Sequence, residues 1–397
     1  MNHLPILQKI SAQILSHSVP TYRRSLYKTI DFKSKLIGIK GPRGAGKSTL
    51  LRQYAKSCGI EPSKILFINC DHPMMAESSL YDVAEAFYAR GGKLLIIDEI
   101  HKSDNFSVQL KSIYDVFDLQ VLFSGSSALR LEHAQGDLSR RAVVHYLGVL
   151  SLREFIEIET GEVFPKYTLK EILEHHYDIA VNVMSRIRPL EQFSNYLDHG
   201  CYPFYRESLN DYSQKLLEVI SLTIDVDLCG IYNIDPSKLD KLKKVMYMLC
   251  STSPYELNIS KLSSAVGTSW PTLSKYIERM DAGSLIHLVR GGSGMRAVNK
   301  PDKLLLDNPN MFNVMCAQCD IGSVRESFFV SQLKDKHQVH YHDKGDFIID
   351  DQWVFEIGGS SKTSTQLEGN PNGFIAADDI EIGDGKKIPL WLFGFLY

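Results

Sequence analysis

Short, continuous apolar runs alternate with helical patterns over the first part of the chain. The runs are Leu36–Ile39, Ile65–Ile68, Leu94–Ile97 and Val121–Phe123. Strands that are apolar on both faces are typical of a parallel sheet that helices cover on each side. The stretch before them, residues 1–35, reads as a helix and a connector. We therefore expect an α/β fold with a parallel sheet between residue 36 and about residue 150.

The rest of the chain changes character twice. From residue 168 to about residue 250 helical patterns dominate and strand signals fade. A break at Ser251–Pro254 leads into a compact segment, 255–300, which ends in the glycine-rich stretch Gly291–Gly294. A helix from Glu326 to Lys334 then precedes strands at 337–342, 346–350 and 353–357, and we expect the apolar segment 388–397 to be a buried strand.

The turn after the first apolar run carries the pattern G-x-x-x-x-G-K-S/T in full. Its residues are Gly41, Pro42, Arg43, Gly44, Ala45, Gly46, Lys47, Ser48 and Thr49, and a helical pattern follows at once. Glycines let the backbone wrap a polyphosphate with its N–H groups pointing inward, and the helix behind adds its positive N-terminal end. We expect Lys47 to reach the β- and γ-phosphates and the Ser48 hydroxyl to ligate Mg²⁺. The motif predicts a nucleoside triphosphate site.

Two acids, Asp98 and Glu99, follow the third apolar run. A buried strand carries its last residues to the carboxyl edge of the sheet, beside the phosphate-binding loop. There Asp98 can hold the hydration shell of Mg²⁺, and Glu99 can polarise the attacking water. Strand ends often carry acids. The pair indicates a nucleotide site because the glycine loop precedes it in the sequence.

Two later features can complete such a site. The fourth run ends in Ser124–Ser127, and a hydroxyl from Ser124 at this edge can orient the water or the γ-phosphate, although a plain turn would look the same. Arg140 and Arg141 follow, and an arginine offered to the γ-phosphate neutralises charge that grows in the transition state. Either arginine can act in cis or in trans, or simply lie on the surface.

The composition of the chain limits the class of protein and the compartment that we expect. The chain has 397 residues, of which 44% are apolar and 23% are charged, as in ordinary globular proteins of two or three domains. A net charge of −3 argues against wholesale coating of nucleic acid. No apolar run approaches the length of a membrane span, and the first residues lack the pattern of a signal peptide. The seven cysteines are odd in number and scattered, which favours a reducing compartment, and we expect a cytoplasmic protein.

The chain resembles the AAA-type ATPases of the archaeal-ATPase group. The resemblance rests on Gly41–Thr49, Leu94–Glu99, Ser124–Ser127 and the stretch from Arg141 to Phe155, and it extends to Tyr196–Pro203, which is similar to the Gly-x-Pro lid motif of that group. It implies a P-loop ATPase that uses ATP and Mg²⁺. It also implies four parts: an ATPase core over 1–160, a helical lid over 161–250, a winged helix over 251–300 and a restriction-nuclease-like α/β domain over 301–397.

Residues 259–290 also indicate a winged helix by their own pattern. A helix over 259–266, a turn at Gly267, a second helix from about residue 269 and the strand-like Leu285–Arg290 follow one another. Ser269, Thr272, Lys275 and Arg279 are expected to face outward on the second helix. Only two of these are basic, whereas affinity for DNA rests mainly on phosphate neutralisation. DNA reading and the docking of a protein partner both remain open for this segment.

The C-terminal region carries three acids that look like the spaced acids of a restriction-type nuclease, Glu326, Asp346 and Glu356. An active member holds Mg²⁺ with such acids and places a lysine two residues after the second strand acid. Gly358 stands at that position here, with Lys362 as a substitute and Gln366 on the next helix. We expect a retained, non-catalytic scaffold. Cys316 and Cys319 have metal-like spacing but no second pair, so we do not expect zinc there.

These features favour an ATP-binding and ATP-hydrolysing switch whose nucleotide state controls the winged-helix and C-terminal parts. Its partners would be ATP and a protein, or a second copy of the chain. Two alternatives stay open: an ATP-regulated DNA nuclease, and a nucleotide-responsive DNA-binding regulator in which hydrolysis hardly matters.

Overall fold

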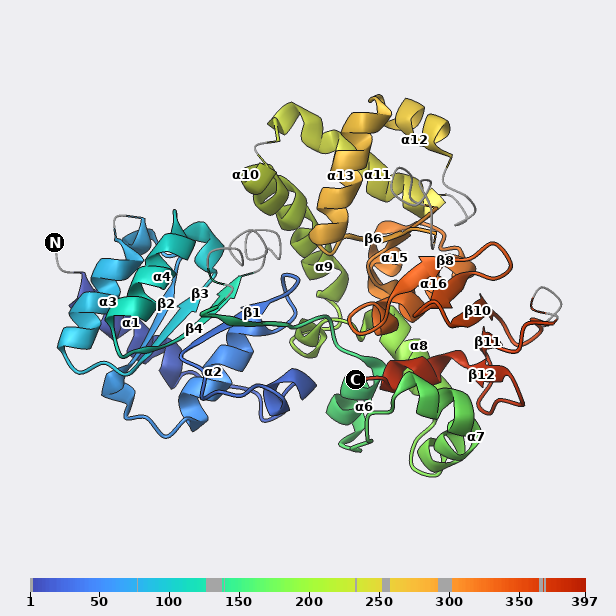
Figure 1. Cartoon of the computed structure of the whole chain (residues 1–397), viewed down its shortest axis with the longest axis horizontal. Coiled ribbons are helices and arrows are strands. Elements are labelled where there is room, and N and C mark those ends of the chain that lie inside the picture. The colour runs from blue at the N-terminus through green and yellow to red at the C-terminus, as the bar shows by residue number, and fades with distance from the viewer. Residues whose placement is uncertain are drawn as a thin grey trace. The chain divides into compact units, whose positions relative to one another are not determined.

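The computed structural model describes residues 3–76, 78–125, 138, 140–232, 234–251, 258–291, 302–363, 367 and 369–397. The chain divides into two compact units, Met1–Gly148 and Val149–Tyr397 (Figure 1). The predicted ATPase core, 1–160, spans the first unit and the first residues of the second. The proposed lid, winged helix and C-terminal domain all lie within the second unit. Ser126, Ser127, Thr252–Pro254, Gly292–Gly294 and Gln366 lie outside the described residues.

A five-stranded parallel sheet organises the first unit. Its strands run in the order β2-β3-β4-β1-β5, and every neighbouring pair is parallel. Its helices and strands are α1 (Leu4–Ser16), β1 (Leu36–Lys40), α2 (Lys47–Ser57), β2 (Ile65–Asn69), α3 (Leu80–Ala89), β3 (Leu94–Asp98), α4 (Phe106–Val116), β4 (Gln120–Gly125) and β5 (Val143–Tyr146). The predicted α/β sheet is confirmed.

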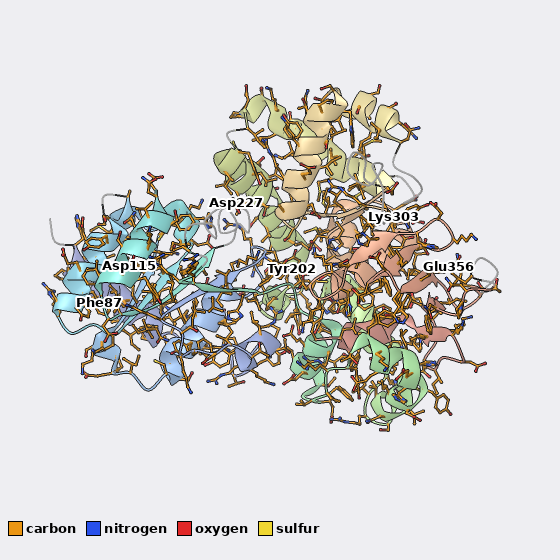
Figure 2. All side chains as sticks on the ribbon, in the orientation of Figure 1. Phe87, Asp115, Tyr202, Asp227, Lys303 and Glu356 are labelled. Carbon is orange, nitrogen blue, oxygen red and sulfur yellow. A yellow bond between two sulfur atoms is a disulfide. The ribbon has the colours of Figure 1, made fainter. Side chains whose placement is uncertain are left out.

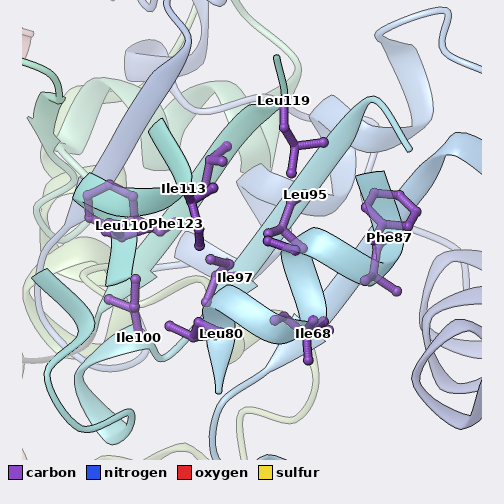
Figure 3. Packing of buried hydrophobic residues seen from close by; sticks show 14 of the residues in the cluster. Ile68, Leu80, Phe87, Leu95, Ile97, Ile100, Leu110, Ile113, Leu119 and Phe123 are labelled. Carbon is purple, nitrogen blue, oxygen red and sulfur yellow. The ribbon is translucent and has the colours of Figure 1, made fainter. Parts of the chain in front are cut away.

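The apolar runs form strands because both of their faces are buried. Successive side chains of a strand point to opposite faces; Leu95 and Ile97 of β3 pack with α3 and α4, whereas Leu94 and Ile96 pack on the side of α2. Figure 3 shows the first of these clusters. Gly38 in β1 is required by packing, because a Cβ there would stand 2.5 Å from the ring of Phe123.

The helix α1 lies along the edge strand β2. Leu4 and Leu7 join the cluster on one face of the sheet, while Ile14 and Leu15 pack against the cluster on the other. The buried Ser11 hydroxyl accepts a hydrogen bond from the Phe67 backbone N–H at 2.8 Å. An edge strand leaves backbone groups unpaired, and α1 satisfies one of them here.

The second unit combines helices with two small sheets. Its helices are α6 (Leu152–Thr160), α7 (Leu169–Met184), α8 (Pro189–His199), α9 (Tyr212–Leu222), α10 (Cys229–Tyr232), α11 (Leu239–Ser251), α12 (Ile259–Val266), α13 (Trp270–Ala282), α15 (Pro309–Met315) and α16 (Ile321–Leu333). A π-helical segment, Thr223–Leu228, joins α9 to α10. Among the described residues, no helix is both long and apolar enough to cross a membrane.

The segment expected to be a winged helix contains elements in the anticipated order. The helices α12 and α13 are joined by a turn in which Gly267 has φ 69°, and they precede the antiparallel pair β6 (Ile286–Val289) and β7 (Lys303–Leu306). Of the residues predicted to form the internal face, Leu262, Val266, Leu273, Tyr276, Ile277 and Met280 are buried, whereas Ile259 is half-buried and Ala265 is exposed.

A mixed sheet of order β12-β11-β10-β9-β8 forms the C-terminal part. Its strands are β8 (Val339–Tyr341), β9 (Phe347–Ile349), β10 (Trp353–Gly358), β11 (Gly373–Ala377) and β12 (Lys387–Pro389). The pairs β10–β11 and β11–β12 are parallel, and the other two pairs are antiparallel. The end of the chain is buried as expected, but the prediction of a strand over 388–397 is wrong beyond Pro389, because Leu390–Phe395 forms a 3₁₀ helix.

Candidate nucleotide-binding site

The glycine loop joins β1 to α2 in a conformation that its glycines permit. Gly44 and Gly46 have φ 82° and 95°, where a side chain would strain the backbone. Gly41 is constrained by space, because a Cβ there would stand 2.1 Å from the Leu147 carbonyl oxygen. The helix α2 begins at Lys47, so its first backbone N–H groups have no partner within the helix and face the loop.

Lys47 is buried against the loop that it belongs to. Its Nζ donates hydrogen bonds to the carbonyl oxygens of Gly41, at 3.0 Å, and Pro42, at 2.7 Å. The side chain is only 4% exposed, so an anionic group in the loop would be close to a positive charge with little water around it.

The parallel sheet brings three predicted residues to the same edge. Asp98 ends β3, and Ser124 lies near the end of β4, which pairs with both β3 and β1. The Ser124 hydroxyl donates to the Asp98 carboxylate and accepts from the Glu99 backbone N–H at 3.3 Å. Ser124 therefore lies beside the acids, on the strand between β3 and β1.

The Asp98 carboxyl is buried, and burial raises its pKa above the ordinary range. Hydrogen bonds from Ser124 and Ser48, together with the charge of Lys47, act in the opposite direction, while Glu99 adds to the rise. Asp98 and Ser48 are thus close enough to share one ligand. A cation at this point would replace the water that the carboxylate has lost.

Glu99 leaves the strand with a left-handed backbone. Its φ is 54°, and it caps the short 3₁₀ helix Ile100–Lys102. The turn brings the His101 side chain back toward Glu99, and Nε2 of His101 lies 3.4 Å from Oε2 of Glu99. His101 is 3% exposed. Such strained backbone is common at functional sites, and sequence analysis did not single out His101.

The residues at this edge fit a magnesium nucleotide. Hydroxyl and carboxylate oxygens, here from Ser48 and Asp98, are ligands that Mg²⁺ prefers. The glycine loop, the start of α2 and Lys47 supply the donors and the positive charge that a polyphosphate needs.

Arg141 does not lie at this edge. Its guanidinium donates to both carboxylate oxygens of Asp115, at 2.9 and 3.0 Å, near the end of α4 (Asp115 is labelled in Figure 2). It stands two residues before Val143, which pairs with Ile37 at the amino end of β1, whereas the glycine loop follows the carboxyl end. Within its own chain, Arg141 therefore does not reach the phosphate-binding loop. Arg140 is exposed.

One buried residue that sequence analysis passed over touches the glycine loop directly. Arg24 is 8% exposed and donates from Nη1 to the Ala45 carbonyl at 2.7 Å. Its Nη2 donates to the Gly148 carbonyl at 3.0 Å. Arg24 precedes the first strand in a stretch without a motif, so nothing in its spacing distinguishes it from a surface arginine.

Each of the three acids expected in a degenerate nuclease site has a lysine partner, and Asp346 lies beside Glu356, because its Oδ2 accepts a hydrogen bond from the Ile357 N–H at 2.7 Å. Lys303 of β7 lies between Glu326, at 2.8 Å, and Asp346, at 3.3 Å. Glu356 pairs with Lys362 at 2.7 Å. Burial raises the pKa of Glu326 to about 7. No group of three metal-ligating side chains occurs within the described ranges.

The face proposed for DNA reading offers little positive charge. Lys275 is exposed, but the Arg279 guanidinium lies 4.3 Å from the centre of the Tyr232 ring. Arg290, in the following strand region, is paired with Glu278 at 3.1 Å.

The expectation of no disulfide is wrong, since Cys250 and Cys316 are bonded to each other. The bond joins α11 to the residue that follows α15, and it encloses a loop of sequence separation 66. Two scattered cysteines meet because the fold brings these helices together, which no spacing in the sequence reveals.

Comparisons with known proteins bear on the first unit above all. Residues 33–156 match the model of the AAA domain. The chain is 26% identical over 392 residues to an uncharacterized protein of Methanocaldococcus jannaschii, and the match covers 90% of this chain and 82% of that protein.

Three solved structures are also similar. AMPPCP-bound DnaA from Aquifex aeolicus is 14% identical over 69% of this chain and 86% of that one, with a TM-score of 0.25. PCH-2 from C. elegans is 15% identical over 70% and 66%, with a TM-score of 0.25. A katanin structure is 20% identical with a TM-score of 0.24; the match covers 39% of this chain and only 60% of the katanin chain.

Proposed function

We propose that this chain is an ATP-hydrolysing switch. ATP binds at Gly41–Thr49, hydrolysis depends on Asp98 and Glu99, and the nucleotide state controls the second unit. The observation that carries the proposal is the meeting of the glycine loop with Asp98 and Ser124 at one edge of the sheet. Adenine as the base follows the AAA domain assigned to residues 33–156.

Each side chain has a distinct task in this proposal. Lys47 exchanges its two carbonyl partners for the β- and γ-phosphates and stabilises the charge that grows on them. Ser48 and Asp98 would hold Mg²⁺, which neutralises phosphate charge. Glu99 accepts a proton from the attacking water, and Ser124 fixes Asp98 and the Glu99 backbone. A role for Arg141 at a γ-phosphate then belongs to the site of a second copy.

The alternatives find less support in the second unit. A metal-dependent nuclease needs converging acids, whereas Lys303 already bridges two of them and Lys362 pairs with the third. A DNA-reading helix needs free basic side chains, and Arg279 is stacked on Tyr232.

Two substitutions separate binding from hydrolysis. Lys47→Ala should abolish detectable binding of magnesium ATP in calorimetry, because it removes the buried charge beside the loop. Glu99→Gln should keep binding within about threefold and lower the rate of phosphate release by a factor of about 10² to 10⁴, which is the usual contribution of a general base.

Matched controls lie on the same elements. Lys56→Ala changes an exposed lysine of α2, and Asp71→Asn changes an exposed acid just after β2; both should bind and hydrolyse like the unmodified protein. A Glu99→Gln protein that turns over ATP at the unmodified rate would exclude Glu99 as the base. An unmodified protein that takes up no magnesium nucleotide would end the proposal.

A further inference from the structure

Arg24 holds two loops of the first unit at once. Its buried guanidinium donates to Ala45 in the glycine loop and to Gly148, the last residue of the unit. Both acceptors are main-chain carbonyls outside regular strands. Because an arginine fork has fixed geometry, a shift of one carbonyl changes the bond to the other.

A second contact ties the same two loops together. The Leu147 N–H donates to the Lys40 carbonyl at 2.7 Å, and the backbone of Leu147 fills the space that a side chain at Gly41 would need. The glycine loop thus rests on the segment through which the chain leaves the unit. The chain just before Arg24 is held by Gln53 of α2, whose side chain donates to the carbonyls of Pro20 and Tyr22 at 2.8 and 2.6 Å.

The chain is anchored again directly after Gly148. In the second unit, the Leu150 N–H donates to the Cys201 carbonyl at 2.8 Å, and the hydroxyl of the buried Tyr196 donates to the Leu150 carbonyl at 2.7 Å. Tyr196 and Cys201 belong to the stretch that resembles a lid motif. Only Val149 separates the residue that Arg24 holds from the residue that this stretch holds.

We propose that Arg24 is the positioning residue through which phosphate binding in the glycine loop is transmitted to the second unit. The inference rests on the proposed function, and it names the route by which the nucleotide acts. Phosphates draw Lys47 and the loop backbone toward themselves; the Ala45 carbonyl moves with the loop, and Arg24 passes this movement to Gly148. The hydrogen bonds of Leu150 with Cys201 and Tyr196 then change. Arg24 touches no phosphate in this scheme.

Hydrogen exchange of the full chain, with and without the magnesium complex of a non-hydrolysable ATP analogue, tests the route. In the unmodified protein we expect the nucleotide to slow exchange at least about tenfold, both in the loop, 41–49, and in the segment 147–151. In Arg24→Met the loop should remain protected and the affinity should change by less than about fivefold, but the slowing at 147–151 should be lost.

Arg23→Met is the matched control, because Arg23 is the exposed neighbour whose guanidinium lies 4.4 Å from the centre of the Tyr27 ring. It should behave as the unmodified protein does. If Arg24→Met fails to fold, Arg24→Lys replaces it, since an ammonium cannot span both carbonyls and should uncouple the two segments in the same way.

The outcomes distinguish the two proposals. No slowing in the loop of the unmodified protein would overturn the nucleotide site and this inference together. Slowing in the loop but not at 147–151 would overturn the inference and leave the nucleotide site intact. Slowing at 147–151 that survives in the Arg24 variants would show that another residue carries the coupling and would overturn the role of Arg24.

Discussion

At the scale of single residues, Asp98 shows how the proposed site trades stability for chemistry. Its carboxyl is 5% exposed, and burial raises its pKa although Ser124, Ser48 and Lys47 all favour the charged form. A buried carboxylate that its neighbours do not fully compensate costs folding free energy. A cation that binds beside the carboxylate would offset this cost in folding free energy.

This cost leads to a prediction for Asp98→Asn. The folded protein holds the Asp98 proton more tightly than the unfolded chain does, so the contribution of Asp98 to stability falls as the pH rises from the ordinary Asp range, near 3.8, through the raised pKa. The Asp98→Asn variant has no ionisable carboxyl at this position, so it does not lose this stability as the pH rises. At neutral pH and without nucleotide, we expect its melting temperature to rise by about 2–4 °C, equivalent to roughly 1 kcal/mol, while binding of magnesium ATP weakens.

Calorimetric melts at neutral and acidic pH check this expectation. The gain should shrink as the pH falls and disappear below about 3.8, where Asp98 becomes protonated in the unfolded chain as well as in the folded protein, and the exposed Asp71→Asn should give no gain. A variant that melts below the unmodified protein at neutral pH would contradict the cost assigned to Asp98.

At the scale of elements, strand order decides which side chains can act together. The strand β4 lies between β1 and β3, so its Ser124 reaches Asp98 and the Glu99 backbone. The same parallel order separates Arg141 from the glycine loop, because Arg141 precedes β5 and the loop follows β1. The sequence indicated what each residue could do chemically. It did not indicate at which edge of the sheet Arg141 would lie.

The contact between α1 and β2 supplies a second prediction. Ser11→Ala leaves the Phe67 N–H without its partner in a buried place, and an unsatisfied buried donor costs about 1–3 kcal/mol. We expect the free energy of unfolding of the first unit to fall by that amount in urea titrations.

Ser16→Ala on the same helix is the control. Its hydroxyl bonds the Gln13 carbonyl at an exposed position, so the change should stay within about 0.5 kcal/mol. Equal effects of the two substitutions would mean that the Ser11 hydroxyl does not stabilise the strand.

At the scale of the whole molecule, the chain forms two units, and the elements after Gly148 share one of them. Residues expected to form a lid contribute to the same interior as the C-terminal part: Asn310 of α15 accepts from the Cys201 N–H and donates to the Tyr196 carbonyl. The predicted lid and the C-terminal part therefore share one packed interior.

The disulfide between Cys250 and Cys316 gives a prediction at this scale. A cross-link that closes a loop of sequence separation 66 stabilises a folded unit by about 2–4 kcal/mol. Reduction with a phosphine, or Cys250→Ser, should lower the melting transition of the second unit and leave that of the first unchanged.

The two treatments should not add to each other, and Cys58→Ser in the first unit should leave the second transition in place. An unreduced protein in which all seven cysteines react with a thiol reagent would contradict the bond.

The sequence by itself determined the parallel sheet, the glycine loop and the sign of the charges around it. Continuous apolar runs can be buried only between two layers of helices, and Gly41–Ser48 needs its glycines for a backbone path that side chains forbid. Both are local requirements, so they leave a pattern in neighbouring residues.

Only the tertiary structure decided which distant groups meet. Arg24 reaches Ala45 and Gly148, Cys250 reaches Cys316, and Lys303 reaches Glu326. It also decided which expected groups do not meet, as with Arg141 and the glycine loop. Such contacts depend on the order of strands and on the packing of helices across long sequence separations. A lone arginine, cysteine or lysine in the sequence carries no mark of its partner.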